Sequence, residues 1–415
     1  MNRQLRTWLR ISLISLLLVA LAGLIMRYKI IYPLPLVDQK NLLHAHSHFA
    51  FAGWITQALM TLLVYYLYQR GDVNAFSRYR PLLWANIITA YGMLFTFPFL
   101  GYQFPSILFS TLSIFVSYWF AIQYWRDAGL APNRNITTYW FRAAVVFNAV
   151  SSAGAFYLAY MLASKSAHTT HYLASVYFFL HFQYNGWFFF ACMGLLSYRL
   201  LLSGVAATKI RQVFLLFVVA CVPAYFLSAL WLPIGKFIYI MVVVAALLQL
   251  VGWGVLMREA VRLFPVIRKQ VTVFAGVLFV FFAVALSIKL LLQAASVIPS
   301  LSRYAFGFRP IIIGYLHLVL LGVITVFLLA YIAAYRLIPL TAAVRWGIIL
   351  FTAGIISNEL LLMMQGIADM RYEPLPAVNK WLLGAALMLF SGMLLVNGGL
   401  LFSKYDRAHN RDAGN

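Results

Sequence analysis

Long apolar windows recur along the whole 415-residue chain, and they constrain its fold more than any other feature. Each has about 20 residues or more, enough for a helix to cross a hydrocarbon core of about 30 Å. Backbone groups in lipid must be satisfied within the segment, so these windows are helices. The sequence therefore predicts an all-α polytopic membrane protein with twelve transmembrane helices, over 9–27, 43–68, 81–101, 104–125, 138–163, 172–198, 212–232, 237–257, 271–296, 310–334, 345–367 and 380–403.

The composition agrees with a membrane protein, since 64% of the residues are hydrophobic and only 10% are charged. A soluble domain has about 25% charged residues. The loops are short, so we expect one membrane domain over 1–403 and a polar tail over 404–415. Both cysteines, Cys192 and Cys221, fall inside predicted spans, and no CxxC or CxxCH motif is present. Neither a disulfide framework nor covalently attached c-type haem is indicated.

The net charge of +22 follows the membrane topology rather than a nucleic-acid surface. With twelve spans both termini lie on one side, which the basic N-terminus assigns to the cytoplasm. That side receives 21 Lys and Arg residues and the other side 9, with Lys289 inside a span. No small-residue cleavage site follows the first apolar window, so we interpret it as a retained helix. We expect a bacterial inner-membrane protein that contacts anionic lipid and binds no nucleic acid.

Three histidines, His44, His46 and His48, crowd the start of the second window, and His181 and His317 lie inside the sixth and tenth. Ionisable side chains within a bilayer are costly and usually functional. On a helix His48 shares the face of His44, whereas His46 points about 200° away. At 1.5 Å per residue, His181 lies about 13 Å and His317 about 10 Å into their helices. With the predicted orientation all of these residues occupy the outer half of the bilayer.

Lys289 and Glu359 are the other ionisable residues deep in spans, and both fall at a similar depth. Together with the histidines they suggest one polar chamber near the external face. A structural interpretation stands beside this one, because intramembrane histidines also bond neighbouring helices and the Lys289–Glu359 pair can simply neutralise itself. Three further histidines lie in or beside loops and are expected to be solvated: His168, His171 and His409.

Two short strings extend the pattern of histidines in helices 2, 6 and 10. These are HFQYNGW at 181–187 and HLVLLG at 317–322. With the twelve predicted helices and cytoplasmic termini, they resemble the catalytic subunit of the haem-copper oxidases, in particular its nitric oxide reductase branch. The resemblance covers the predicted topology, but specific motifs cover only about three short segments. It implies haem ligands from helices 2 and 10 and a second metal held from helices 6 and 7.

The chain also departs from that family. Tyr315 stands where the family's helix 10 carries the ligand of a high-spin haem, and Asn185 stands where nitric oxide reductases place a metal-binding glutamate. The seventh predicted helix, VFLLFVVACVPAYFL, lacks the family's His-His pair. The resemblance therefore implies a degenerate member without the complete two-metal site.

From the resemblance we expect one b-type haem, ligated by His317 and by His44, with His48 as the alternative to His44. Arg309 and Arg371 would pair with its propionates. Copper or non-haem iron at a second site is a further hypothesis, with Tyr315 as a haem ligand and a pocket lined by His181, Tyr184 and Asn185. The expected function is electron transfer, or the handling or sensing of NO or O2, with a redox protein or quinol as electron donor; reductase activity stays open.

Two other hypotheses compete with a haem protein. In the first, copper or zinc binds directly to imidazole nitrogens, which these metals prefer; its ligands would be His44, His48, His181 and His317. In the second, the chain is a transporter in which Lys289 and Glu359 couple transport to ion movement. No inverted repeat is evident to support the second hypothesis.

Overall fold

The protein is described by a computed structural model that covers residues 3–130, 135–166, 168–373 and 375–402. Eleven helices in these residues are long and apolar enough to cross a membrane. Their bounds are Arg3–Ile31, Gln39–Gln69, Ala75–Leu100, Phe104–Gly129, Ile136–Ala163, Thr169–Leu202, Lys236–Arg262, Val273–Ala295, Arg309–Ala334, Ala342–Met370 and Val378–Leu401. The chain is thus an all-α, multi-pass membrane protein, as the apolar windows predict, and the predicted tail over 404–415 lies outside the described residues.

The continuous helix predicted over 212–232 is not formed. Helix α9 (Ala207–Cys221) ends before Pro223, and a 3-10 turn (Pro223–Ser228) follows it. Proline lacks the N–H of an α-helical hydrogen bond, so the helix stops there. At 1.5 Å per residue the 15 residues of α9 reach only about 22 Å, so a twelfth crossing would need the 3-10 turn as well. The predicted loop before Arg309 also differs, because it contains a short helix, α13 (Pro299–Gly307).

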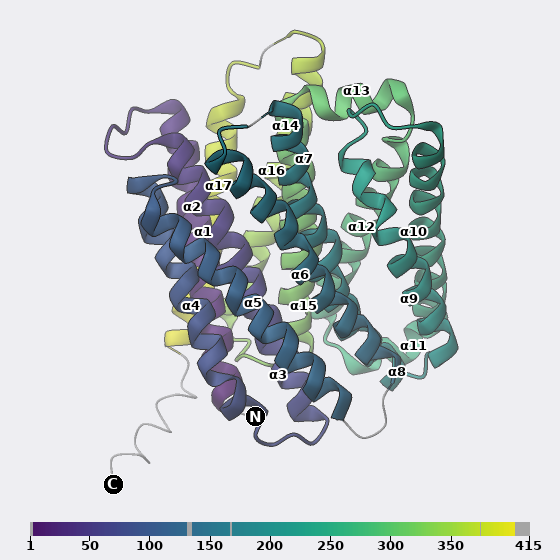
Figure 1. Ribbon diagram of the computed structural model, residues 1–415. Coiled ribbons are helices and arrows are strands. Elements are labelled where there is room, and N and C mark those ends of the chain that lie inside the picture. The colour runs from purple at the N-terminus through teal and green to yellow at the C-terminus, as the bar shows by residue number, and fades with distance from the viewer. Residues whose placement is uncertain (1–2, 131–134, 167, 374, 403–415) are drawn as a thin grey trace. The chain divides into compact units, whose positions relative to one another are not determined.

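Two compact units divide the chain. The first comprises residues 1–68, 73–116 and 325–415, and the second comprises 69–72 and 117–324. In the first unit α16 (Ala342–Met370) packs along α17 (Val378–Leu401), α1 (Arg3–Ile31) packs on α17, and α2 (Gln39–Phe49) packs on α4 (Ala75–Leu100) (Figure 1). Gly347 and Gly392 let α16 and α17 approach closely, since a Cβ on Gly347 would lie 2.6 Å from the Gly392 carbonyl oxygen. Small residues of this kind are the usual means of close helix packing in lipid.

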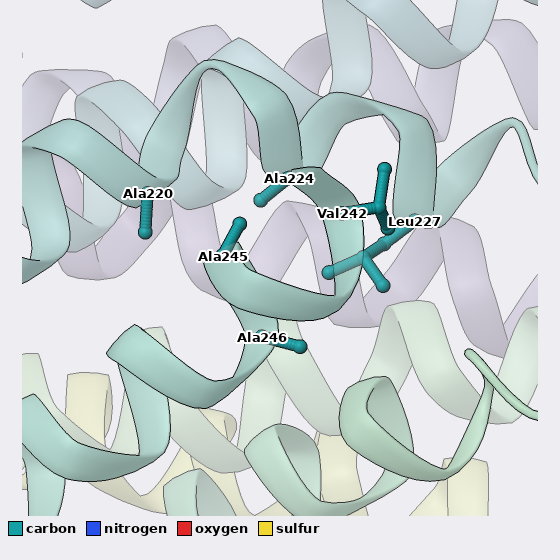
Figure 2. Close-up of a cluster of buried hydrophobic side chains, with 6 residues drawn as sticks. All are labelled: Ala220, Ala224, Leu227, Val242, Ala245 and Ala246. Carbon is teal, nitrogen blue, oxygen red and sulfur yellow. The ribbon is translucent and has the colours of Figure 1, made fainter. Parts of the chain in front are cut away.

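In the second unit α6 (Ile136–Ala163) packs against α7 (Thr169–His181) and α8 (Phe189–Leu202). Helix α10 (Lys236–Arg262) packs on α9 and on α12 (Val273–Ala295), and a short helix, α11 (Phe264–Gln270), follows it. Figure 2 shows the small buried side chains that join α10 to α9 and its 3-10 turn: Ala220, Ala224, Leu227, Val242, Ala245 and Ala246. Because most of these side chains are small, the turn after Pro223 packs directly on α10.

Three of the spans change locally from α-helix to π-helix. The segments are Ala50–Thr56, between α2 and α3 (Gln57–Gln69), Phe182–Phe188, between α7 and α8, and Leu318–Thr325, between α14 (Arg309–His317) and α15 (Val326–Ala334). A π-helical turn inserts a residue into the helix, is rare, and is found frequently at functional sites. In the first segment the Ala52 carbonyl accepts a hydrogen bond from the Asn86 side chain at 3.0 Å. Each of the three segments follows one of the intramembrane histidines.

Candidate functional site

The turn after α4 brings Tyr102 against the start of α2. Asp38 begins α2 by accepting a hydrogen bond from the Asn41 N–H at 2.9 Å. Gly101 ends α4 at φ 56°, and a Cβ there would lie 2.7 Å from Asn41 Oδ1. Glycine meets both demands, because it adopts positive φ readily and needs no space for a side chain. The next residue, Tyr102, therefore reaches the histidines of α2.

His44 and His48 both contact the Tyr102 phenol, which confirms that they share a face. The phenol oxygen lies 3.3 Å from His48 Nε2 and 3.5 Å from His44 Nδ1. The His48 ring also stacks on Phe97, with 4.7 Å between ring centroids and 6° between planes. His44 Nε2 is buried and has no hydrogen-bond partner. A buried nitrogen without a partner calls for a ligand or a water.

His46 faces the other way, as the helical spacing predicts. Its Nδ1–H donates to the Val19 carbonyl of α1 at 3.1 Å, and its ring lies against Gly23 of the same helix. The ring thus bonds two helices of the first unit together, which is the structural role expected of an intramembrane histidine on that face.

His317 ends α14 in the second unit with one nitrogen engaged by the backbone. Its Nδ1–H donates to the Ile313 carbonyl at 2.9 Å. In a neutral ring this bond leaves the lone pair on Nε2. Metal-binding histidines usually donate their other N–H to a carbonyl or carboxylate in this way. The bond from His317 Nδ1–H to the Ile313 carbonyl is thus of the kind that metal-binding histidines make, and a ligand role for His317 stays a prediction.

The other residues predicted around a haem lie in different parts of the chain. Tyr315 is half-buried in α14, in the second unit, which also contains Tyr184 of the π-helical segment after His181. Arg309 is exposed at the start of α14, also in the second unit. Arg371 is exposed at the end of α16, in the first unit. Their roles beside a haem stay predictions.

His181 is fully buried, and both of its ring nitrogens have partners. Its Nε2–H donates to the Cys221 carbonyl at 2.8 Å, and its Nδ1 accepts from the Asn185 amide at 3.1 Å. The Cys221 carbonyl accepts this bond because α9 ends before Pro223, and the last carbonyls of a helix lack intrahelical partners. The His181 side chain thus satisfies a carbonyl at the C-terminal end of α9.

The neighbours of His181 in the π-helical segment are buried as well. The Tyr184 phenol lies 3.5 Å from Ser228 Oγ in the 3-10 turn. Asn185 Oδ1 has no hydrogen-bond partner, although the Asn185 amide nitrogen bonds His181. Asn185, which bonds His181, lines a small cavity together with Lys289.

The remaining predicted members of the polar chamber divide between the two units. His44, His48 and Glu359 belong to the first unit, and His317 belongs to the second with His181 and Lys289. Within its own unit Glu359 accepts a hydrogen bond from the adjacent Asn358 amide at 3.1 Å. One chamber shared by residues of both units stays a prediction.

The same sequence pattern precedes or forms each π-helical segment, and sequence reasoning missed it. The strings are HFAFAGWIT at 48–56, HFQYNGWFF at 181–189 and HLVLLGVIT at 317–325, each with a glycine five residues after the histidine. The signal was readable as HxxxxG in three of the histidine-bearing spans. It makes His48, rather than His44, the residue of α2 that corresponds to His181 and His317.

The chain matches no known family in a scan against protein-family models, and no curated protein has a significantly similar sequence. Within the part of the chain that the structure describes, no group of three or more histidine, cysteine, aspartate or glutamate residues is arranged to hold a metal ion. The function is therefore argued from the residues and their geometry.

Proposed function

We propose that the protein is a haem-binding integral membrane protein, with His317 and a histidine of α2 as axial ligands of a single b-type haem. It would act in electron transfer or in handling or sensing NO or O2, in a bacterial inner membrane. Both termini would lie in the cytoplasm, which requires that α9 and its 3-10 turn together form a twelfth crossing. The observation that carries the proposal is the repeated unit of a histidine, a π-helical turn and a glycine. Such turns gather at functional sites because they displace side chains from regular helical positions.

The repeated unit selects His48 as the α2 ligand in place of His44. His48 and His317 stand at equivalent positions of HxxxxG, and each lies about ten residues from the start of its span. The two spans are also neighbours one to two turns further along, where Trp54 Nε1–H donates to Thr325 Oγ1 at 2.9 Å. In this proposal His48 Nε2 would exchange its 3.3 Å contact with the Tyr102 phenol oxygen for the iron, and the phenol would keep its contact with His44 Nδ1.

Two features of the residues fit a porphyrin iron. The Nδ1–H of His317 is held by a backbone carbonyl, which orients Nε2 as a ligand. The α2 face offers a second imidazole, and the neighbouring Nε2 of His44 is buried without a partner. A haem with two imidazole ligands is a six-coordinate centre suited to electron transfer. Arg309 and Arg371 remain the proposed partners of its propionates, since guanidinium groups bind carboxylates well.

An absorption spectrum with a pyridine haemochrome assay on the purified protein tests the proposal. A b-type spectrum with about one haem per chain is expected, and a colourless preparation that contains no iron would reject it. Metal analysis of the same sample distinguishes haem binding from the hypothesis that copper or zinc binds directly. Stoichiometric copper or zinc without porphyrin would favour direct binding by the histidines. A second metal in addition to haem would extend the proposal to copper or non-haem iron near His181, Tyr184 and Tyr315.

A further inference from the structure

Basic side chains gather at one end of the second unit, where α8 and α10 end and α9 begins. Residues 199–273 contain eight Lys and Arg residues, and all but Lys236, which begins α10, belong to this end. The same stretch has a single acidic residue, Glu259, which pairs with Arg262 at 3.7 Å. One carboxylate cannot balance the positive charge of the seven basic residues, which are Arg199, Lys209, Arg211, Arg258, Arg262, Arg268 and Lys269.

A hydrogen bond brings these residues together in space although they are far apart in the sequence. Ser203 Oγ–H, just after α8, donates to Gln270 Oε1 at the end of α11, at 2.9 Å. Helix α9 begins at Ala207, a few residues after Ser203, and α11 directly follows α10. Figure 1 shows the end of α8 and the short helix α11 beside each other. The ends of α8 and α10, the start of α9 and the whole of α11 therefore form one surface, which we call the basic surface.

Helix α11 presents both charge and apolar surface outward. Gln270 faces the end of α8, and Arg268, two residues earlier, points about 200° away from it around the helix. Phe264 lies one turn before Arg268 and is 56% exposed. Exposed apolar side chains also adjoin the basic residues on the neighbouring helices, namely Leu202, Val261 and Val273. Basic and apolar side chains mixed in this way suit the layer between lipid headgroups and acyl chains. A surface that meets only water or a soluble acidic partner would gain nothing from the apolar ones.

We propose that the basic surface is a binding site for anionic phospholipid, whose phosphodiester groups are held by the exposed basic side chains of α10 and α11. Arg258 and Arg262 are one turn apart on α10, where like charges repel each other, and a phosphate beside them relieves this repulsion. Guanidinium groups also bind phosphate through two parallel hydrogen bonds. Four to eight basic residues next to a membrane-spanning helix are typical of sites for anionic lipid. The inference is independent of haem binding and concerns only the second unit.

Stabilisation of the purified full chain by added lipid tests this site. The unfolding temperature in a mild non-ionic detergent is followed as dioleoyl phosphatidylglycerol is added, with dioleoyl phosphatidylcholine, which has the same acyl chains, as the control. Only the anionic lipid should raise the unfolding temperature, in a saturable manner. Added salt should weaken its effect, because salt screens exposed charges. Equal stabilisation by phosphatidylcholine, or by inorganic phosphate at the same concentration, would overturn the proposal.

Two matched double variants assign the effect to α11. Arg268→Gln with Lys269→Gln should weaken the apparent affinity for phosphatidylglycerol at least about tenfold, since each basic residue beside an anionic membrane is worth about fivefold. Arg80→Gln with Arg345→Gln removes the same charge from exposed positions of the first unit and should leave the affinity unchanged.

Native mass spectrometry, which counts the lipid molecules retained by each protein, gives a second readout that does not depend on unfolding. The wild type should retain phosphatidylglycerol in preference to phosphatidylcholine, and the α11 variant should lose this preference. An α11 variant that behaves as the wild type, or an equal loss in both double variants, would remove the assignment to the basic surface.

Discussion

His181 and His317 begin the same sequence pattern, yet the structure engages them differently. His181 is fully buried, and both of its nitrogens have hydrogen-bond partners, the Cys221 carbonyl and the Asn185 amide. His317 is only half-buried, and its Nδ1 bonds the carbonyl of its own helix, at Ile313. The first ring joins two elements of its unit, whereas the Nδ1 bond of the second stays within α14.

This difference suggests that the same HxxxxG segment with its π-helical turn has two roles, one in packing and one in ligand binding. A π-helical turn follows each of these histidines, and the groups around the ring then decide its role. Where a helix end offers a carbonyl, as Cys221 does before Pro223, the ring completes the protein's own hydrogen bonding. Where the ring's Nδ1–H bonds its own helix, as in His317, the lone pair of the neutral ring is on the other nitrogen, Nε2. The predictions below separate these two purposes.

The largest effect is expected at His317. His317→Ala should lower the haem content of the purified protein at least about tenfold, since even outer-shell partners of a metal are worth 10- to 100-fold in affinity. His181→Ala should retain haem. The measurement is the haemochrome absorbance per chain, at equal protein concentration. If His181→Ala bleaches the protein and His317→Ala does not, the comparison is reversed and the proposed ligand set is wrong.

The two histidines of α2 should differ in the same assay. His48→Ala should lose haem as His317→Ala does, whereas His44→Ala should keep the haem and change its absorption bands or reduction potential through Tyr102. Tyr102→Phe offers a milder variant, because it keeps the ring and removes only the phenol oxygen. Loss of haem in His44→Ala with retention in His48→Ala would transfer the ligand role to His44, against the HxxxxG pattern.

The long apolar windows made most of the fold predictable. A backbone in lipid has few alternatives to a helix, so hydropathy alone located eleven of the spans. Hydropathy says little about where a helix breaks inside an apolar window, and the break before Pro223 was therefore missed. The short helix α13 was missed for a related reason, because its proline and glycine look like turn residues although Pro299 occupies a first-turn position.

The candidate site was predictable only where one helix decides the geometry. The shared face of His44 and His48, and the opposite face of His46, follow from 3.6 residues per turn. The contacts with Tyr102 and Cys221 do not, because they depend on which loop or helix end lies beside each histidine. The π-helical segments escape any analysis by a fixed period, and their signal is the recurrence of HxxxxG rather than hydrophobicity.

A structural role for His181 predicts a loss of stability without a loss of haem. His181→Ala would leave the Cys221 carbonyl and the Asn185 amide without their partner, at a cost of about 1–3 kcal/mol. The free energy of unfolding in mixed micelles, measured by SDS titration, gives this quantity. An unchanged unfolding free energy would mean that these hydrogen bonds contribute nothing, and that His181 is held for some other purpose.

Alanine substitutions of the glycines in the three HxxxxG segments should differ in their cost to the free energy of unfolding. At Gly186 an added Cβ would lie 2.6 Å from the Cβ of Phe147, so Gly186→Ala should cost about 1–3 kcal/mol. At Gly53 it would meet the Phe49 ring at 2.5 Å, which can rotate, and at Gly322 the nearest atom, Ala285 Cβ, is 3.4 Å away. Gly254→Ala, with nothing within 4 Å, is the control. An equal cost at Gly186 and Gly254 would contradict the packing described for the second unit.

The smallest effect is expected at the contact between two HxxxxG segments, the one that begins at His48 and the one that begins at His317. Trp54 and Thr325 share a buried hydrogen bond of 2.9 Å, and interhelical bonds in membranes are worth about 0.6 kcal/mol on average. A double-mutant cycle with Trp54→Phe and Thr325→Val isolates this coupling, because the ring volume lost at Trp54 is common to the single and the double variant and cancels. If the bond also sets the spacing of the helices that carry His48 and His317, the double variant should shift the haem bands although its stability changes little. A cycle without coupling energy, together with an unshifted spectrum, would show that Trp54 and Thr325 have no part in holding these helices at the proposed site.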